Sequence, residues 1–305
     1  IELLGNADLA LFRAKTNGRG RSLVFEPSLR MEAAARRLYG MEIHRAVKQG
    51  EVLLVYQPQI RLTDGALTGA EALIRWRHPA RGLLTPAAFL PALESGPLAA
   101  TVGSWVLDEA CAQAATWRRN GMKSFRMGVN LFGAQFRVGD FAEEVIETLE
   151  KHGLPPCSLE LEITENIVLD HDDFVLEKLQ KLREYGVGIA FDDFGTGFAS
   201  LSLLKRYPLT RIKIDRSFVD GMLVSEKDAS VVRAILDMAK AFDLETVAEG
   251  IEREPERDSL LRQGCTEGQG YLIGKPMLAP HFAEAFSIAP PAAVIASRNA
   301  ARAIC

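Results

Sequence analysis

The feature that most constrains the fold is a series of short apolar runs, separated by longer amphipathic segments. Each run has the length and the Val, Ile, Leu and Phe content of a β-strand. Apolar residues recur at helical spacing between most of them, as in 103–121, 140–153 and 228–244, and two of these segments end at or near glycine. The predicted strands are VLLVYQ (52–57), LTGAEALIRW (67–76), FRMGVNL (125–131), LELEIT (159–164), GVGIAFDDF (186–194), RIKID (211–215), ETVAEGI (245–251) and GQGYLIG (268–274).

Strands that alternate with helices at this spacing predict a parallel sheet. Eight such strands within roughly 240 residues favour a closed barrel, so we predict an α/β fold of the TIM-like (β/α)8 type. An open, doubly wound sheet is the alternative. The G-x-G-x-x-G turn expected after its first strand is absent from the sequence.

The two ends of the chain differ from this pattern. Residues 7–27 predict a short helix, a Gly-rich turn and one strand, which is too little to fold alone. We therefore expect 1–28 to be the end of a preceding domain and 29–50 to be a connector helix that leads into a barrel spanning 38–286. The tail, 287–305, contains a Pro-Pro break and an Ala-rich stretch, and its pattern fits either a docked or a frayed helix.

Composition narrows the classes of function. A net charge of −4 argues against binding a nucleic acid polymer through a broad basic surface. The four cysteines form no C-x-x-C pair and the five histidines show no metal-ligand spacing, so we expect reduced thiols, a cytoplasmic location and oxygen ligands for any metal. No apolar stretch reaches the ~18 residues that span a bilayer, so we expect no membrane contact within this stretch of chain. The chain begins with Ile, and we expect it to be a piece of a longer protein that could carry a membrane anchor.

Acidic and amide side chains lie at the ends of the predicted strands. The C-terminal strand ends of a barrel meet at one rim, where carboxylates this close together require cations. Oxygen ligands favour Mg²⁺ or Mn²⁺ over zinc or copper, and two such ions about 3.5–4 Å apart are suited to displacement at phosphorus. The residues concerned are Glu71, Asn130, Glu162, Glu165, Asp192, Asp193, Lys213, Asp215, Glu249, Glu252 and Gln269.

Simpler roles exist for several of these residues. Asp192 and Asp193 have the residue type of helix caps and turns. In the alternating LELEIT run, we expect Glu160 to face solvent and Glu162 to face the rim. Taken alone, RIKID would make Lys213 a surface residue of an edge strand, and only the neighbouring acidic strand ends favour a role in the site.

Eight motifs in order give the chain a specific resemblance. The three letters EAL carry little information alone, but the ordered set resembles the EAL-domain cyclic-di-GMP phosphodiesterases over about residues 38–285. The motifs are YQP (56–58), GAEALIRWRHP (69–79), VNL (129–131), LEITE (161–165), DDFGTGFASL (192–201), IKID (212–215), VAEGIE (247–252) and GQGYLIGKP (268–276).

The resemblance implies a fold, a reaction and a set of roles. It implies a TIM-like barrel whose first strand runs antiparallel to the rest, and a homodimer. It also implies hydrolysis of one phosphodiester of cyclic-di-GMP to linear pGpG by water activated by two Mg²⁺ or Mn²⁺ ions. The implied metal ligands are Glu71, Asn130, Glu162, Asp192 (as a bridge), Asp193 and Glu249. The implied catalytic residues are Lys213, which assists the water, with Glu71, Asp192 and Glu249, and the implied substrate contacts are Gln57, Arg75, Glu252 and Gln269. Glu165 is expected to anchor the DFGTGFASL loop, which couples the site to the dimer interface.

Three further expectations follow from the resemblance. Residues 7–21, ADLALFRAKTNGRGR, are similar to the end of a GGDEF domain whose signature loop is missing, so no cyclase activity is expected. Phe132 and Thr266 depart from the usual family residues without removing a ligand. A receptor that binds cyclic-di-GMP without cutting it is the alternative function, and a dimer gated through the 29–50 helix is a third. Degenerate receptors usually lack several ligands, whereas this chain retains them.

Overall fold

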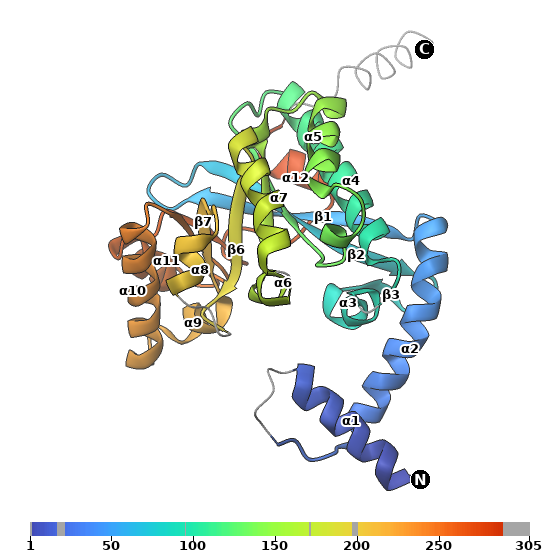
Figure 1. The fold of residues 1–305 in the computed structure, drawn as a ribbon. Coiled ribbons are helices and arrows are strands. Elements are labelled where there is room, and N and C mark those ends of the chain that lie inside the picture. The colour runs from blue at the N-terminus through green and yellow to red at the C-terminus, as the bar shows by residue number, and fades with distance from the viewer. Residues whose placement is uncertain (1, 17–21, 95, 171, 197–200, 289–305) are drawn as a thin grey trace, which may run out of the picture. The chain divides into compact units, whose positions relative to one another are not determined.

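The protein is described here by a computed structural model (Figure 1). The described residues are 2–16, 22–94, 96–170, 172–196 and 201–288. They divide into two compact units, one drawn from Ile1–Leu53 and Ile74–Val102 and the other from Leu54–Leu73 and Gly103–Cys305.

The first unit is built around a buried tryptophan. Trp76 is fully buried, and its ring meets those of Tyr39 and Phe89 edge-on, at centroid distances of 5.6 and 5.8 Å. Its indole Nε1 donates to Glu51 over 3.1 Å, so the polar atom of this apolar core has a partner. The elements that lie wholly in this unit are α1 (Glu2–Thr16), α2 (Pro27–Lys48), β3 (Gly82–Leu84) and α3 (Pro86–Glu94).

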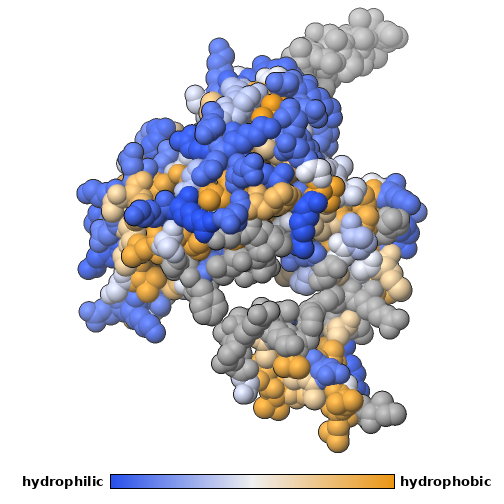
Figure 2. All heavy atoms as spheres, in the orientation of Figure 1, coloured by the Kyte–Doolittle hydropathy of each residue, from blue (hydrophilic) through white to orange (hydrophobic). Residues whose placement is uncertain are grey.

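The N-terminal part of this unit corrects one expectation. The helix predicted over 29–50 is present as α2, but the strand predicted within 7–27 is wrong, because residues 22–26 have no regular structure. An isolated strand leaves its backbone groups unpaired, and no strand of the described chain pairs with this segment. In Figure 2, apolar side chains gather over α1, where Leu3, Leu4 and Leu11 are exposed.

The second unit contains a closed barrel of eight strands, as predicted. The strand order is β1-β9-β8-β7-β6-β5-β4-β2, pairing of β1 with β2 closes the ring, and β3 extends β2 at one end. Neighbours from β2 to β9 run parallel, and β1 runs antiparallel to β9. The strands are β1 (Val52–Arg61), β2 (Leu67–His78), β4 (Arg126–Asn130), β5 (Leu159–Ile163), β6 (Gly188–Phe194), β7 (Arg211–Ile214), β8 (Glu245–Ala248) and β9 (Glu267–Gln269).

A short turn accounts for the antiparallel first strand. β1 ends at Arg61 and β2 begins at Leu67, and the Arg61 N–H donates to the Ala66 carbonyl across the turn. Gly65 supplies a φ of 70° there. So few residues can join strands only as a hairpin, because a parallel connection needs a dozen residues or more.

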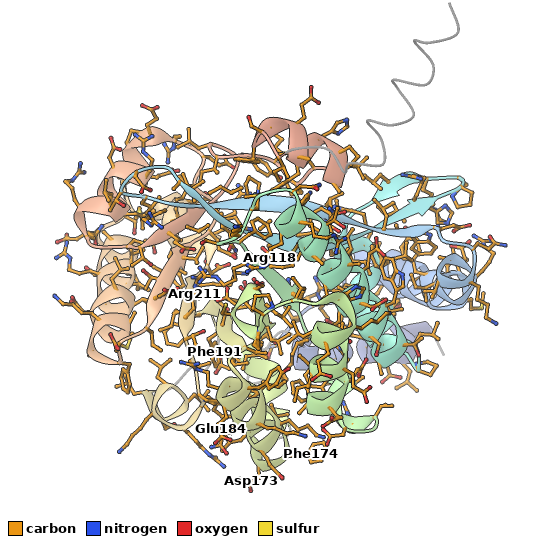
Figure 3. The ribbon with its side chains drawn as sticks, turned by 90° about the horizontal axis from the view of Figure 1, so that it is seen from above. Arg118, Asp173, Phe174, Glu184, Phe191 and Arg211 are labelled. Carbon is orange, nitrogen blue, oxygen red and sulfur yellow. The ribbon has the colours of Figure 1, made fainter. Side chains whose placement is uncertain are left out.

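Helices surround these strands (Figure 1). Local signals set their ends: Asp140 accepts from the N–H groups of Ala142 and Glu143 to begin α5, and Gly153, at φ 64°, ends it. In Figure 3, Phe174 lies on the exposed side of α7, whereas Phe191 of β6 is buried. No helix in the described part of the chain combines the length and apolarity needed to cross a bilayer. The remaining helices are α4 (Ala99–Arg119), α5 (Phe141–His152), α6 (Glu165–Asp170), α7 (Asp172–Tyr185), α8 (Leu201–Arg206), α9 (Arg216–Gly221), α10 (Glu226–Ala241), α11 (Glu254–Arg262) and α12 (Ala279–Ala285).

Charged side chains fill part of the barrel interior. Residues two apart on a strand share a face, so β5 places both Glu160 and Glu162 inside, and β7 does the same with Arg211 and Lys213. The solvent-facing position predicted for Glu160 is therefore wrong: the residue is 1% exposed. Strands of a closed barrel are covered on both faces, and Glu160 pairs there with the Arg211 Nε at 3.3 Å.

We predict that the barrel depends on the aromatic cluster around Trp117 of α4. Its ring stacks on Phe282 at 4.5 Å and meets Tyr56 edge-on at 4.9 Å. Trp117→Ala should lower the free energy of unfolding by about 3–5 kcal/mol, because the cavity left behind adds to the lost burial. Denaturant titration measures this. Phe174→Ala, at a position 48% exposed, is the control and should cost less than about 1 kcal/mol; equal losses would contradict the prediction.

Candidate active site

Lys213 lies at the centre of the charged cluster at the C-terminal end of the barrel. It is 1% exposed, and its Nζ lies 2.6 Å from Glu162, 2.7 Å from Glu249 and 3.0 Å from Asp192. Glu71 follows at 3.6 Å. These carboxylates come from β2, β5 and β6 and from the residue after β8, so the fold brings together residues that are far apart in sequence.

Amide side chains orient Glu71. The Asn130 Nδ2 donates to one of its oxygens over 2.7 Å, and the Gln269 Nε2 donates to the other over 2.6 Å. Gln269 also donates to the Gln57 Oε1, at 3.1 Å, and accepts from the Gln59 Nε2, at 2.8 Å. Our sequence reasoning missed Gln59, although its spacing of two from Gln57 on the same strand was a usable signal.

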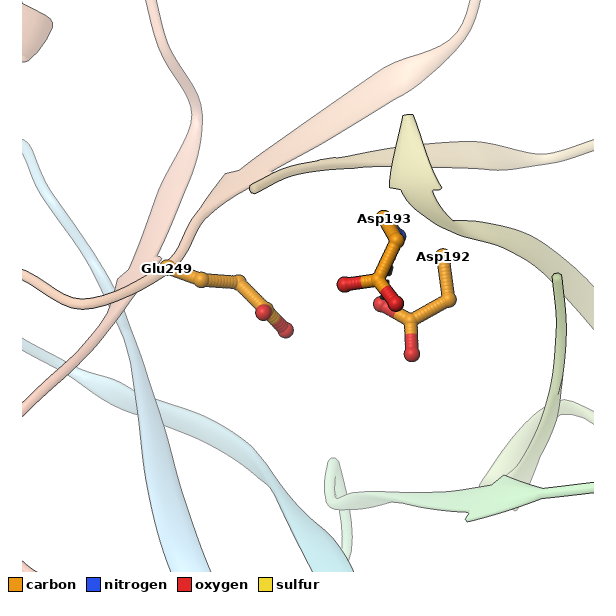
Figure 4. A group of neighbouring side chains, drawn as sticks. All are labelled: Asp192, Asp193 and Glu249. Carbon is orange, nitrogen blue, oxygen red and sulfur yellow. Dashed lines mark hydrogen bonds between the residues drawn. The ribbon is translucent and has the colours of Figure 1, made fainter. Parts of the chain in front are cut away.

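Backbone geometry brings Asp193 to the same side as Asp192. Consecutive strand residues normally point to opposite faces, but Asp193 has a φ of 52° and the register with β7 shifts between Phe191 and Phe194. The result is a group of three carboxylates, from Asp192, Asp193 and Glu249, each offering an oxygen within 4.8 Å of the others. Figure 4 shows their carboxylates facing one another.

Three further residues were predicted to belong to the site: Arg75, Glu165 and Glu252. Glu252, 40% exposed, accepts from the Arg216 Nη2 over 2.8 Å. Arg75 lies in the part of β2 that belongs to the first unit, and its Nη1 donates to the Ile74 carbonyl. Glu165 begins α6, while part of the loop it is expected to anchor, 197–200, lies outside the described residues. Their roles stay predictions.

Comparison with known proteins identifies the family. The sequence model of the EAL domain matches residues 41–276. The chain belongs to the EAL domain family. This confirms the resemblance noted from the eight motifs, whereas the assignment of residues 1–28 to a GGDEF domain stays a prediction.

Relatives of this EAL domain include proteins of Pseudomonas aeruginosa. The bifunctional diguanylate cyclase/cyclic di-GMP phosphodiesterase MucR is 40% identical over 278 residues, which is 91% of this chain and 41% of MucR. The cyclic di-GMP phosphodiesterase NbdA is 38% identical over 277 residues, which is 90% of this chain and 35% of NbdA. The chain thus spans less than half the length of these curated relatives.

Solved structures of similar fold contain bound nucleotides. The MucR phosphodiesterase in complex with c-di-GMP matches with a TM-score of 0.77 and 40% identity, over 80% of this chain and 99% of that one. The EAL enzyme Bd1971, with cAMP and cyclic-di-GMP bound, matches with a TM-score of 0.80 and 34% identity, over 83% of this chain and 69% of that one.

Burial and the neighbouring charges set the protonation of the carboxylates around Lys213. Burial raises the pKa of Glu249 to about 8 and that of Glu162 well above its usual range, and Lys213 only partly offsets the effect. Burial also acts to raise the pKa of Glu71, but Lys213 and the two amide donors outweigh it, so this pKa is lowered. For Lys213, burial favours the neutral amine, yet the surrounding carboxylates prevail and raise its pKa well above its usual range.

The donor set fits a metal ion. The Glu162 Oε1 is buried and has no hydrogen-bond partner among the described residues, and it lies over Gly128, where an added Cβ would be only 2.2 Å away. A buried carboxylate oxygen that lacks a donor is costly unless a cation binds it. The carboxylates of Asp192, Asp193 and Glu249 lie close enough together to hold a metal. Glu162 is linked to Asp192 and Glu249 through the Lys213 ammonium.

We predict that metal binding strengthens as pH rises from 6 towards 8.5. Desolvation, Asp192 and Asp215 raise the pKa of Asp193 to about 6, and the pKa of Glu249 is about 8. Below these values protons compete with the metal; above them the carboxylates are free to bind it. Calorimetric titration with Mn²⁺ should give at least about tenfold tighter binding at pH 8.5 than at pH 6, and an affinity that does not change with pH would contradict this.

We also predict that Gly128→Ala weakens Mn²⁺ binding, because the methyl group would displace the Glu162 carboxylate. Gly40→Ala is the matched control, since an added Cβ at Gly40 meets no atom within 4 Å. Calorimetry should show weaker binding for the first variant and unchanged binding for the second. Equal affinities would mean that Glu162 is not a ligand.

Proposed function

We propose that this EAL domain hydrolyses one phosphodiester bond of cyclic-di-GMP to linear pGpG with two divalent ions, Mg²⁺ or Mn²⁺, at the barrel mouth. The observation that carries the proposal is the convergence of five carboxylates, from four separate segments of the chain, around Lys213. The activities named for MucR and NbdA, and the nucleotide in the MucR complex, support the choice of substrate.

The balance of charge supports two ions rather than one. Once ionised, the five carboxylates at the mouth and the ammonium of Lys213 leave four negative charges, which two dications would neutralise. All the donors are oxygens, which suits Mg²⁺ or Mn²⁺. The residues that would hold the ions are Glu71, Asn130, Glu162, Asp192, Asp193 and Glu249, with Asp192 between them. When bound, such ions activate water and polarise the phosphoryl oxygens.

Lys213 acts in this proposal as a positively charged ammonium group. Its raised pKa keeps it protonated at neutral pH, so it does not act as a general base. A buried ammonium can orient the attacking water and stabilise negative charge that develops on the phosphoryl group. The carboxylates that now pair with Lys213 fix its position before substrate arrives.

The hydrogen-bonded amide side chains of Gln57 and Gln269 are suited to contact the substrate. Gln57 is held by Gln269 and by its own bond to the Gly274 carbonyl, at 3.2 Å, so both amides are fixed in orientation. In this proposal they contact or frame the nucleotide. From the family resemblance, Arg75 would bind a phosphate or guanine, for which a guanidinium provides paired donors, and Glu252 would contact or frame the substrate.

The homodimer and the loop-anchoring role of Glu165 remain proposals that rest on the family resemblance, and the cytoplasmic location remains one that rests on the cysteine pattern. Sedimentation of the purified chain tests the dimer. A monomer at all concentrations would remove the proposed coupling between Glu165 and a dimer interface.

The activity test uses the purified chain, cyclic-di-GMP and Mn²⁺ or Mg²⁺, with products separated by chromatography. We expect pGpG to accumulate, and Glu71→Ala to lower the rate at least about 100-fold because it removes a ligand. Glu184→Ala, at an exposed position of α7 labelled in Figure 3, is the control and should retain the rate.

Two outcomes would contradict the proposal. If metal and cyclic-di-GMP bind but no pGpG forms, the domain is a receptor and not a hydrolase. If Glu71→Ala and Glu184→Ala have equal rates, the cluster around Lys213 does not carry the reaction.

A further inference from the structure

A groove lies at the N-terminal ends of the barrel strands, within the second unit. Its volume is about 630 Å³, and its wall includes Thr68, Arg126 and Glu267, which lie at or near the starts of β2, β4 and β9. Lys213 and its carboxylates lie at the opposite, C-terminal ends of the strands. The groove is therefore separate from the proposed catalytic site.

The base of this groove is neutralised by its own ion pairs. Arg126 contacts Glu267 at 2.9 Å and Glu245 at 3.3 Å. Arg211, fully buried behind it, pairs with Glu160 at 3.3 Å, with Glu267 at 3.0 Å and with Glu245. The carboxylates at the base are thus already matched by arginines, which is the stabilising role expected of this end of a barrel.

Two cations on the groove wall remain unmatched. Arg118, at the end of α4, donates through its Nη1 to the Lys123 carbonyl and to the Ser158 Oγ, contacts that hold its guanidinium in place. Within the described parts of the chain, neither Arg118 nor Lys123 forms an ion pair with a carboxylate. Both line the groove, and Figure 3 labels Arg118 and the buried Arg211.

The rest of the wall is partly apolar. Phe125, which is 4% exposed, and Pro155 line the same groove. A concave site of several hundred cubic ångströms with apolar walls and a few fixed polar groups is typical of small-molecule binding. Two cations in one groove that lack carboxylate partners among the described residues favour an anionic ligand, and phosphate is an anion that arginine and lysine both bind well.

We propose that this groove binds a small organic phosphate, with its phosphate held by Arg118 and Lys123 and its organic group against Phe125 and Pro155. The site is independent of the proposed hydrolysis. The small organic phosphate would bind at the end of the barrel opposite the carboxylate cluster around Lys213.

Cys157 provides a reporter inside the groove. It is exposed and lines the groove, whereas Cys111 and Cys265 are buried. In a Cys305→Ser background, the rate of Cys157 alkylation by iodoacetamide is followed by mass spectrometry, with the chain loaded with Mn²⁺. Phenyl phosphate should slow alkylation to a plateau as its concentration rises.

Two further probes separate the contributions. Phenol carries the ring without the charge and should give no protection, and inorganic phosphate carries the charge without the ring and should protect only at higher concentration. Equal protection by phenol, or none by phenyl phosphate, would overturn the proposal. Equal protection by inorganic and phenyl phosphate would overturn the contact with Phe125 and Pro155.

Variants locate the phosphate. Lys123→Glu, in an exposed turn, and Arg118→Gln should each raise the phenyl phosphate concentration for half-protection at least about tenfold, because each removes a charge-assisted contact. Arg119→Glu is the control, because it makes the same charge change as Lys123→Glu at an exposed residue of α4 that adjoins Arg118 but does not line the groove. This variant should leave the phenyl phosphate concentration for half-protection unchanged. Each variant is compared with its own rate without ligand. Retained affinity in Lys123→Glu, or equal losses in Lys123→Glu and Arg119→Glu, would refute the site even if Arg118→Gln does not fold.

Discussion

The need to neutralise buried charge governs the interior of this barrel. Carboxylates removed from water are costly unless a cation lies within a few ångströms. At the C-terminal end a single buried ammonium, on Lys213, contacts four carboxylates at 2.6–3.6 Å. Burial, together with the neighbouring carboxylates, raises the pKa of Glu162 and of Glu249, so both favour the protonated form at neutral pH. The cluster is therefore prepared to exchange those protons for metal ions.

At the other end of the interior the excess of negative charge is smaller. Arg126 and Arg211 face Glu160, Glu245 and Glu267, and the positive and negative groups there nearly balance. Residues two apart on a strand face the same side, so β5 and β7 each contribute to both ends of the interior. Glu160 and Arg211 belong to the ion pairs at one end, and Glu162 and Lys213 belong to the site at the other. One end is thus suited to holding the barrel together, and the other to binding cations and reacting groups.

Closure of the barrel converts this alternation into a site. The hairpin after β1 places Gln57 and Gln59 beside β9, so that Gln269 bonds to both and to Glu71. The shift in β6 and the positive φ of Asp193 then add a carboxylate that a regular strand would point away. The irregular backbone of β6 thus adds Asp193 to the oxygen ligands that the other strand ends provide.

The sequence alone predicted the eight strands, the barrel and the acidic strand ends, because apolar periodicity and residue type are local properties of the chain. It also indicated the family through ordered motifs. The folded structure was needed to show that Glu160 is buried, that Gln59 bonds to Gln269, and that residues 22–26 form no strand. The first two depend on partners distant in sequence, which are Arg211 across the barrel and β9 beside β1. The third reflects that no strand in the described part of the chain pairs with residues 22–26. Pairing between distant segments sets both burial and hydrogen bonding, and local periodicity carries no record of it.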